Sequence, residues 1–134
     1  MSETRLIEAA FDVRQRAHAP YTQFAVGAAL LTKSGRIFVG CNIENISLRL
    51  TICAEQAAVA AAVASGDVDF VAIAVVADSK EPVVPCGACR QLLAEFNPAL
   101  EIIASTVDHR SQIFSLSELL PRPTQGILES FRNV

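Results

Sequence analysis

The chain has 134 residues, of which 51% are hydrophobic and 19% are charged, and its formal net charge is -3. This length is typical of one domain, so we expect residues 1–134 to form a single domain with its own core. The basic residues are scattered and the balance is acidic, which disfavours a nucleic-acid polymer as a partner. The low charge content favours instead a homo-oligomer in which further copies cover apolar surface.

Neither a membrane span nor a secretory signal is predicted. The longest apolar runs, such as residues 57–64, are far shorter than the roughly 20 residues that cross a bilayer. The first residues, Met1–Arg5, lack the basic start and apolar stretch of a signal peptide, so we expect a cytoplasmic protein. In that reducing compartment the four cysteines are expected to be thiols or metal ligands rather than disulfides.

The first half of the chain predicts a helix, a hairpin and a second helix. Apolar residues recur at helical spacing from Glu3 to Ala17. Two β-rich runs, 25–32 and 36–43, are separated by a Lys-Ser-Gly turn and are expected to pair as antiparallel strands. An alanine-rich helix follows from Cys53 to Ser65 and ends at a glycine.

The second half alternates strands and helices. The continuous apolar run Phe70–Ala77 predicts a strand buried on both faces, at the centre of a sheet. A helix is predicted over 86–96, followed by strands over 100–105 and 112–116. Strand-helix-strand alternation requires parallel crossovers. We therefore expect an α/β fold with three αβα layers, in which a mixed five-stranded sheet carries helices on both faces.

Two cysteine motifs open the two later helices. Cys53-Ala54-Glu55 precedes Pro85-Cys86-Gly87-Ala88-Cys89, and the first cysteines of the two motifs are 33 positions apart. Helices in neighbouring crossovers of a parallel sheet start at the same edge, so Cys53, Cys86 and Cys89 are expected to converge.

Three converging thiolates favour a zinc ion. Cys86 and Cys89 are three residues apart, so both sulfurs can reach one metal ion. Three protein ligands leave one coordination position for water, as in a catalytic zinc site. Cys41 could complete a four-thiolate site, and buried thiols or a redox Cys-x-x-Cys pair are further alternatives.

Glu55 is the candidate catalytic residue. It lies two positions after Cys53, which makes it a poor fourth ligand but places it beside the metal. A carboxylate there can take a proton from water and deliver it to a leaving group. The pattern predicts a hydrolase, although Glu55 could also simply stabilise the start of its helix.

At this point the chain resembles the small, zinc-dependent cytidine deaminases, whose signature is Cys-Ala-Glu followed by Pro-Cys-x-x-Cys. The resemblance covers nearly the whole chain in several segments in the same order. They are Ala19-Pro20-Tyr21, residues 24–30, 40–45, 51–55 and 85–91, and Glu118-Leu119-Leu120-Pro121.

The resemblance implies a function and a set of roles. It implies one zinc ion per subunit, homotetramers with shared active sites, and deamination of cytidine or deoxycytidine to the uridine in pyrimidine salvage. Water would attack C4 of the pyrimidine while Glu55 protonates N3 and assists the departure of ammonia. Asn42 and Glu44 would bind the ribose hydroxyls, Phe24 would pack against the nucleoside, and the backbone of Ala54 would meet the base.

The chain departs from the family pattern at several positions. Gln56 stands where an arginine usually offsets the charge of the thiolates, which leaves Arg90 to take that role. Leu48 and Thr124 stand near positions where relatives have aromatic residues. The resemblance implies that these aromatic residues reach the active site of a neighbouring subunit, so their loss predicts a roomier pocket that accepts cytidines with substituents on the base or on N4.

Other readings of the pattern stay open. Phe24 is also compatible with a core residue, and Asn42 and Glu44 with turn or surface residues. The chain could be a blasticidin-type deaminase that acts on a cytosine-containing antibiotic. It could also be a non-catalytic protein that binds zinc or nucleosides, because the loss of aromatic residues is compatible with a former active site that has taken on another function.

Overall fold

The computed structural model describes residues 3–124, which surround one five-stranded sheet. The elements in chain order are α1 (Glu3–Arg14), β1 (Val26–Thr32), β2 (Ile37–Cys41), the 3₁₀ helix η1 (Leu48–Leu50), α2 (Ala54–Ala64), β3 (Phe70–Ala77), α3 (Gly87–Ala94), β4 (Glu101–Thr106), β5 (Ser111–Ser115) and α4 (Leu116–Leu119). None of the helices in this part of the chain is long and apolar enough to cross a membrane.

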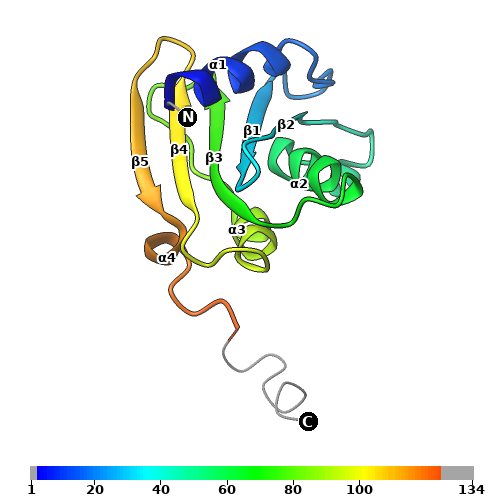
Figure 1. Ribbon diagram of the computed structural model, residues 1–134. Helices are drawn as coiled ribbons and strands as arrows, with labels where there is room; N and C mark the ends of the chain where they lie inside the picture. Colours follow the sequence, from blue (N-terminus) through cyan, green and yellow to red (C-terminus); the bar gives the residue numbers. More distant parts are fainter. Residues whose placement is uncertain (1–2, 125–134) are drawn as a thin grey trace.

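The sheet has the strand order β2-β1-β3-β4-β5, which Figure 1 shows from right to left. β3 and β4 are parallel, and every other neighbouring pair is antiparallel. β2 and β3 both run antiparallel to β1, so they point in the same direction although β1 lies between them. The helices that follow β2 and β3, α2 and α3, therefore begin at the same edge of the sheet.

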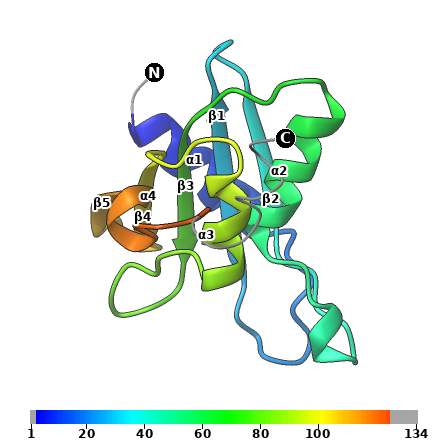
Figure 2. The ribbon, with the colours of Figure 1, turned by 90° about the horizontal axis from the view of Figure 1, so that it is seen from below.

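Helices cover both faces of the sheet and form two cores. On one face α1 packs against β1, β3 and β4 through a cluster of small and branched side chains: Leu6, Ala10, Ala29, Ala72, Ala74, Val76 and Ile103. On the other face α2 and α3 lie next to each other (Figure 2) and pack on a second cluster that includes Ala58, Ala62, Leu93, Leu30, Ile73 and Ile102. The predicted three-layer αβα fold with a mixed five-stranded sheet is confirmed.

Two glycines let helices approach the sheet closely. A Cβ atom on Gly40 of β2 would lie 2.4 Å from the backbone nitrogen of Ala58 and 2.5 Å from the carbonyl oxygen of Ala54. A Cβ atom on Gly27 of β1 would lie 1.9 Å from the carbonyl oxygen of Ala10. The first turn of α2 therefore rests directly on the backbone of β2, and α1 rests in the same way on β1.

Several element ends differ from the sequence-based expectation. The first helix ends at Arg14 instead of Ala17, because the next three residues form tighter bonds of the i→i−3 type. Leu116 was expected at the end of a strand but begins α4. There Ser115 and Glu118 form a capping box, in which the Ser115 backbone N–H donates to the Glu118 carboxylate at 2.8 Å.

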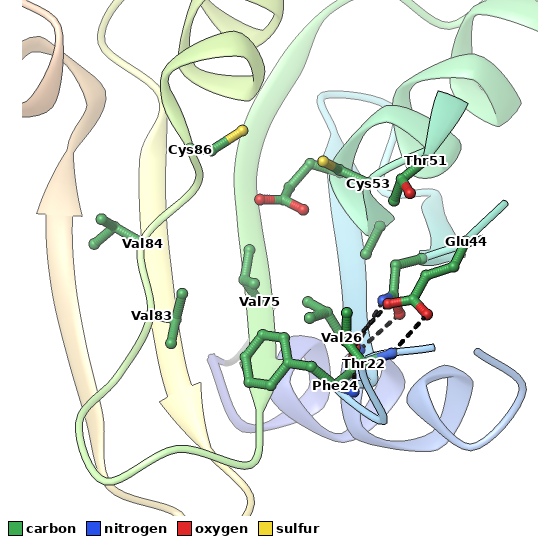
Figure 3. A pocket seen from close by; sticks show the side chains of 13 residues that line it. Thr22, Phe24, Val26, Glu44, Thr51, Cys53, Val75, Val83, Val84 and Cys86 are labelled. Carbon is green, nitrogen blue, oxygen red and sulfur yellow. Dashed lines mark hydrogen bonds between the residues drawn. The ribbon is translucent and has the colours of Figure 1, made fainter. Parts of the chain in front are cut away.

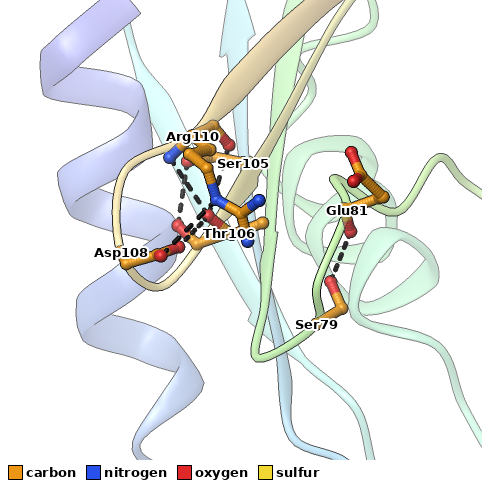
Figure 4. Close-up of polar contacts among 6 residues, drawn as sticks. All are labelled: Ser79, Glu81, Ser105, Thr106, Asp108 and Arg110. Carbon is orange, nitrogen blue, oxygen red and sulfur yellow. Dashed lines mark hydrogen bonds and ion pairs between the residues drawn. The ribbon is translucent and has the colours of Figure 1, made fainter.

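The turn between β4 and β5 is closed by side chains of its own residues (Figure 4). The Thr106 hydroxyl donates to the Asp108 carboxylate and accepts from the backbone N–H of Arg110 at 3.0 Å. The Arg110 guanidinium lies 3.4 Å from the same carboxylate. Because every group in this ion pair is solvent-exposed, it serves to shape the turn rather than to form a site.

Candidate active site

Three sulfur atoms meet where α2 and α3 begin. Cys53 is the N-cap of α2, Cys86 is the N-cap of α3, and Cys89 lies in the first turn of α3. Their Sγ atoms all lie within 4.8 Å of one another, and Figure 3 shows the sulfurs of Cys53 and Cys86 pointing toward each other. The convergence expected from the crossover topology is confirmed.

The donor set fits a zinc ion. Tetrahedral zinc with Zn–S distances of about 2.3 Å requires sulfur atoms about 3.8 Å apart, which is within the observed limit. Within residues 3–124 the metal-competent cluster contains these three cysteines and does not include Cys41. A three-thiolate site leaves one coordination position for water, so the site has the ligand count of a catalytic zinc centre.

The three thiols differ in acidity in the absence of a metal. Burial, with Glu55 and the other thiols nearby, raises the pKa of Cys89 far above its usual range, and burial is also the main cause that raises the pKa of Cys53. Burial acts on Cys86 as well, but hydrogen bonds from the N–H groups of Cys89 and Ala88 and from neighbouring thiols outweigh it and lower the pKa of Cys86. Three thiolates so close together need a cation, because each metal ligand has to lose its proton.

Glu55 lies beside the sulfur cluster, in the first turn of α2. Its side chain is buried and lines the same pocket as Cys53 and Cys86. Burial raises the pKa of this carboxyl above its usual range, against the opposing effect of a hydrogen bond from its own backbone N–H. A buried carboxyl of this kind has an environment suited to accepting and releasing a proton.

The side chain of Gln56 caps α2. Its carbonyl oxygen accepts a hydrogen bond from the backbone N–H of Cys53 at 2.8 Å, while the Cys53 side chain accepts from the backbone of Gln56. This reciprocal arrangement is a capping box in which a cysteine takes the place of the usual serine or threonine. Gln56 thus holds the backbone of Cys53. From the sequence alone, Gln56 was interpreted only as the loss of a positive charge.

Arg90 makes contacts that the sequence did not predict. Its guanidinium donates to the carbonyl oxygens of Pro85 at 2.7 Å and Leu119 at 3.3 Å. It was expected to pair with the zinc thiolates, but the hydrogen bonds recorded for it in the described part of the chain go to backbone oxygens. Arg90 therefore ties the loop before Cys86 to α4, and a direct role toward the sulfurs stays a prediction.

A cavity of about 340 Å³ opens in front of the sulfurs and brings together the other predicted site residues. Its lining includes all four positions expected to bind substrate: Phe24, Asn42, Glu44 and Ala54. Asn42 and Glu44 are buried beyond the end of β2, where Asn42 donates to the carbonyl oxygen of Phe24 and Glu44 accepts from the backbone N–H of Tyr21, both in the loop that precedes β1. The volume lies in the range of small-molecule sites.

The cavity also has walls that sequence reasoning did not single out. Thr22 and Thr51 add hydroxyl groups, and Val75, Val83 and Val84 form an apolar side, as Figure 3 shows. The two adjacent valines directly before Pro85 were the available signal, because they follow a polar stretch and lie immediately before the second cysteine motif. Leu48 lies in η1 and Thr124 lies next to Gln91 and Pro98, so neither lines this cavity.

The family model for the cytidine and deoxycytidylate deaminase zinc-binding region matches residues 1–105. The chain belongs to this deaminase family. The cysteine cluster is accordingly the zinc centre of a deaminase fold, and zinc is its cofactor.

Individual deaminases support the same conclusion. A cytidine deaminase from Halalkalibacterium halodurans is 49% identical over 122 residues, which cover 90% of this chain and 92% of that protein. The crystal structure of cytidine deaminase from Burkholderia pseudomallei superposes with a TM-score of 0.87 at 45% identity, over 90% of this chain and 98% of the other. A blasticidin-S deaminase from Bacillus cereus is 40% identical, but over only 54% of this chain and 58% of its own length.

Proposed function

We propose that this deaminase hydrolyses cytidine and deoxycytidine to the corresponding uridines and ammonia, in pyrimidine salvage. The observation that carries the proposal is the set of three converging sulfurs beside a buried carboxyl in a cavity of about 340 Å³. Cytidines with substituents on the base or on N4 are included, because Val83 and Val84 form an apolar wall of the cavity.

The reaction consumes one water molecule, forms a C4–O bond, breaks the bond between C4 and the exocyclic nitrogen, and releases ammonia. Cys53, Cys86 and Cys89 would hold the zinc ion. When bound, zinc acts as a Lewis acid that lowers the pKa of water and so supplies a nucleophile near neutral pH. The protein's own contribution is to keep these thiolates together at two helix N-termini, where the helix dipoles favour negative charge.

Glu55 would move the protons. Its carboxylate takes one proton from water, delivers a proton to N3 of the pyrimidine, and then assists protonation of the departing amine. Burial favours this cycle, since a carboxyl with a raised pKa gains and loses a proton at less cost near neutral pH. The same burial keeps bulk water from competing for that proton.

The rest of the cavity would orient the nucleoside. Asn42 and Glu44 provide polar groups on one side and would bind the ribose hydroxyls, while Phe24 would pack against the base or sugar face. Ala54 begins α2 next to Cys53 and lines the cavity, and its backbone would contact the base. Arg90 and Gln56 would act indirectly: Arg90 holds the segment before Cys86, and Gln56 holds the backbone of Cys53.

We also propose that the protein is a homotetramer whose subunits share active sites. The segment between β2 and α2 exposes several large apolar side chains: Ile46 at 82%, Leu50 at 64% and Leu48 at 58%. It is continuous with the cavity, because Glu44 and Thr51 at its two ends are lining residues. A contiguous apolar surface beside a substrate cavity is best covered by another copy of the chain. A cytoplasmic location is part of the proposal, because a reducing compartment keeps the three thiols available to bind a metal.

The test is a substrate screen with metal analysis on the same sample. Cytidine, deoxycytidine, N4-substituted cytidines and blasticidin S are followed by loss of ultraviolet absorbance and release of ammonia. We expect turnover of cytidine and deoxycytidine by protein that contains one zinc ion per chain. Turnover of blasticidin S alone would replace the proposed substrate, and zinc-loaded protein that deaminates none of these compounds would refute the enzymatic function.

A further inference from the structure

The loop between α1 and β1 carries two lining residues of the cavity, Thr22 and Phe24, without regular secondary structure. Polar side chains hold it in place. Asn42 donates to the carbonyl oxygen of Phe24 and accepts from the backbone N–H of Val26, both at 2.8 Å. Gln23, at the centre of the loop, has a positive φ of 64°, which marks a sharp reversal of the chain. The position of Phe24 therefore depends on contacts outside the loop's own backbone.

Glu44 holds the same loop through both oxygens of its carboxylate. One oxygen accepts from the backbone N–H groups of Tyr21 at 3.0 Å and Thr22 at 3.1 Å, and the other accepts from the Thr22 hydroxyl. Among the described residues, that hydroxyl is the one side-chain group recorded as a donor to Glu44. These bonds, led by the one from the hydroxyl, lower the pKa of Glu44. The carboxylate is therefore held in its charged, acceptor form.

The Thr22 hydroxyl links two sides of the cavity. While it donates to Glu44, it accepts a hydrogen bond from the backbone N–H of Phe24 at 3.1 Å. A hydroxyl has one hydrogen, so giving it to Glu44 fixes the direction of the O–H bond and leaves lone pairs for Phe24. Figure 3 shows Thr22, Phe24 and Glu44 grouped on the same side of the pocket.

We propose that Thr22 is a positioning residue that aims the Glu44 carboxylate at the sugar hydroxyls of the nucleoside and holds the segment that carries Phe24. This inference rests on the proposed function, in which Glu44 binds the sugar. It adds a specificity role for a residue that the sequence motifs do not single out. The preference for nucleosides with free ribose hydroxyls depends on the hydroxyl of Thr22, since without it only one oxygen of the Glu44 carboxylate stays bonded to the loop and the other loses its fixed orientation toward those hydroxyls.

The test compares Thr22→Val, which keeps the shape of the side chain but removes the hydroxyl, with Thr22→Ser, which keeps the hydroxyl. Thr22→Ala serves as a second variant without a hydroxyl. Thr22 lies on the exposed side of its loop, so all three substitutions are compatible with the fold. Each zinc-loaded protein is assayed with cytidine and with 2′,3′-dideoxycytidine, which lacks the two hydroxyls.

For Thr22→Val and Thr22→Ala we expect KM for cytidine to rise about tenfold with kcat within about twofold of wild type, as for the loss of a hydrogen bond to a charged group. The preference for cytidine over the dideoxy compound should fall, and Thr22→Ser should restore both values. A merely structural role would lower activity on both substrates equally and leave KM unchanged. An equal loss of activity on both substrates would overturn the inference. So would a Thr22→Val enzyme with the kinetics of wild type, or a Thr22→Ser enzyme in which KM is not restored. Inactive wild-type protein would instead overturn the proposed function itself.

Discussion

The contact between Gly40 and the first turn of α2 predicts a specific defect when a single methyl group is added. In Gly40→Ala the new Cβ atom would lie 2.4 Å from the Ala58 nitrogen and 2.5 Å from the Ala54 oxygen, whereas ordinary contact begins at 3.4 Å. The obstructing atoms belong to helix backbone, which cannot rotate away. The first turn of α2 therefore has to move by about 1 Å, at a cost of about 2 kcal/mol in the free energy of unfolding.

The displaced turn carries Cys53 as its cap and Glu55 in its second position. A shift of about 1 Å at a reacting group costs on the order of a hundredfold in rate. We therefore expect kcat for cytidine to fall by about that factor in Gly40→Ala, together with weaker retention of zinc during dialysis against a chelator. The assays are ammonia release, metal analysis and urea unfolding, all on the same preparation.

Gly27→Ala is the matched control. Its Cβ atom would lie 1.9 Å from the Ala10 carbonyl oxygen, so the clash is at least as severe, but the displaced helix is α1 on the opposite face of the sheet. We expect a comparable loss of stability, with kcat and zinc retention of the folded protein within about threefold of wild type. The two variants could lose stability alike while Gly40→Ala keeps full activity and zinc. That result would refute the inference that contact with β2 positions Cys53 and Glu55.

Three further predictions address the carboxyl, the apolar segment and the turn at the end of α2. Glu55→Gln should retain one zinc per chain in metal analysis while kcat falls by roughly 10²–10⁴, as for loss of a general acid-base group; a variant that keeps wild-type kcat would assign proton transfer elsewhere. Leu50→Glu places a charge on the exposed apolar segment and should shift the mass measured by light scattering from a tetramer to a smaller species, whereas an unchanged mass would place the interface on another surface. Asp67 accepts hydrogen bonds from the hydroxyls of Ser34 at 2.7 Å and Thr32 at 2.8 Å, and these bonds lower its pKa in the folded protein. The contribution of Asp67 to stability is therefore complete above the pKa that it has in the unfolded chain, and it is lost as pH falls through the lower pKa of the folded state. Urea unfolding should therefore find Asp67→Asn less stable than wild type at pH 7, with the difference shrinking toward about pH 3; a difference independent of pH would exclude the charge as its cause.

The central strand and the cysteine cluster could be predicted closely because each has a strong physical signal. The predicted and observed bounds of β3, Phe70–Ala77, are identical. A continuous apolar run is typical of a central strand, and its first and last apolar residues mark the ends of the strand. The convergence of Cys53 with Cys86 and Cys89 follows from crossover topology, which is nearly invariant in α/β sheets.

Contacts between irregular segments could not be predicted in the same way. The bonds between Thr22 and Glu44 join two loops that have no periodicity, and hydrogen-bonding residues alone do not indicate their partners. Arg90 reaches the carbonyl of Leu119 because α4 packs near α3, and this short helix was not expected. Its signal was present in the sequence, however, as a serine followed three residues later by Glu118.

The most direct test of the account is the metal content of the purified protein and of its cysteine variants. We expect one zinc ion per chain in wild type and in Cys41→Ser, and loss of stoichiometric zinc in Cys53→Ser, Cys86→Ser and Cys89→Ser, because the three clustered sulfurs hold the ion and Cys41 lies outside the cluster. Wild-type protein without stoichiometric metal, or with two of these three sulfurs joined in a disulfide, would contradict the central claim.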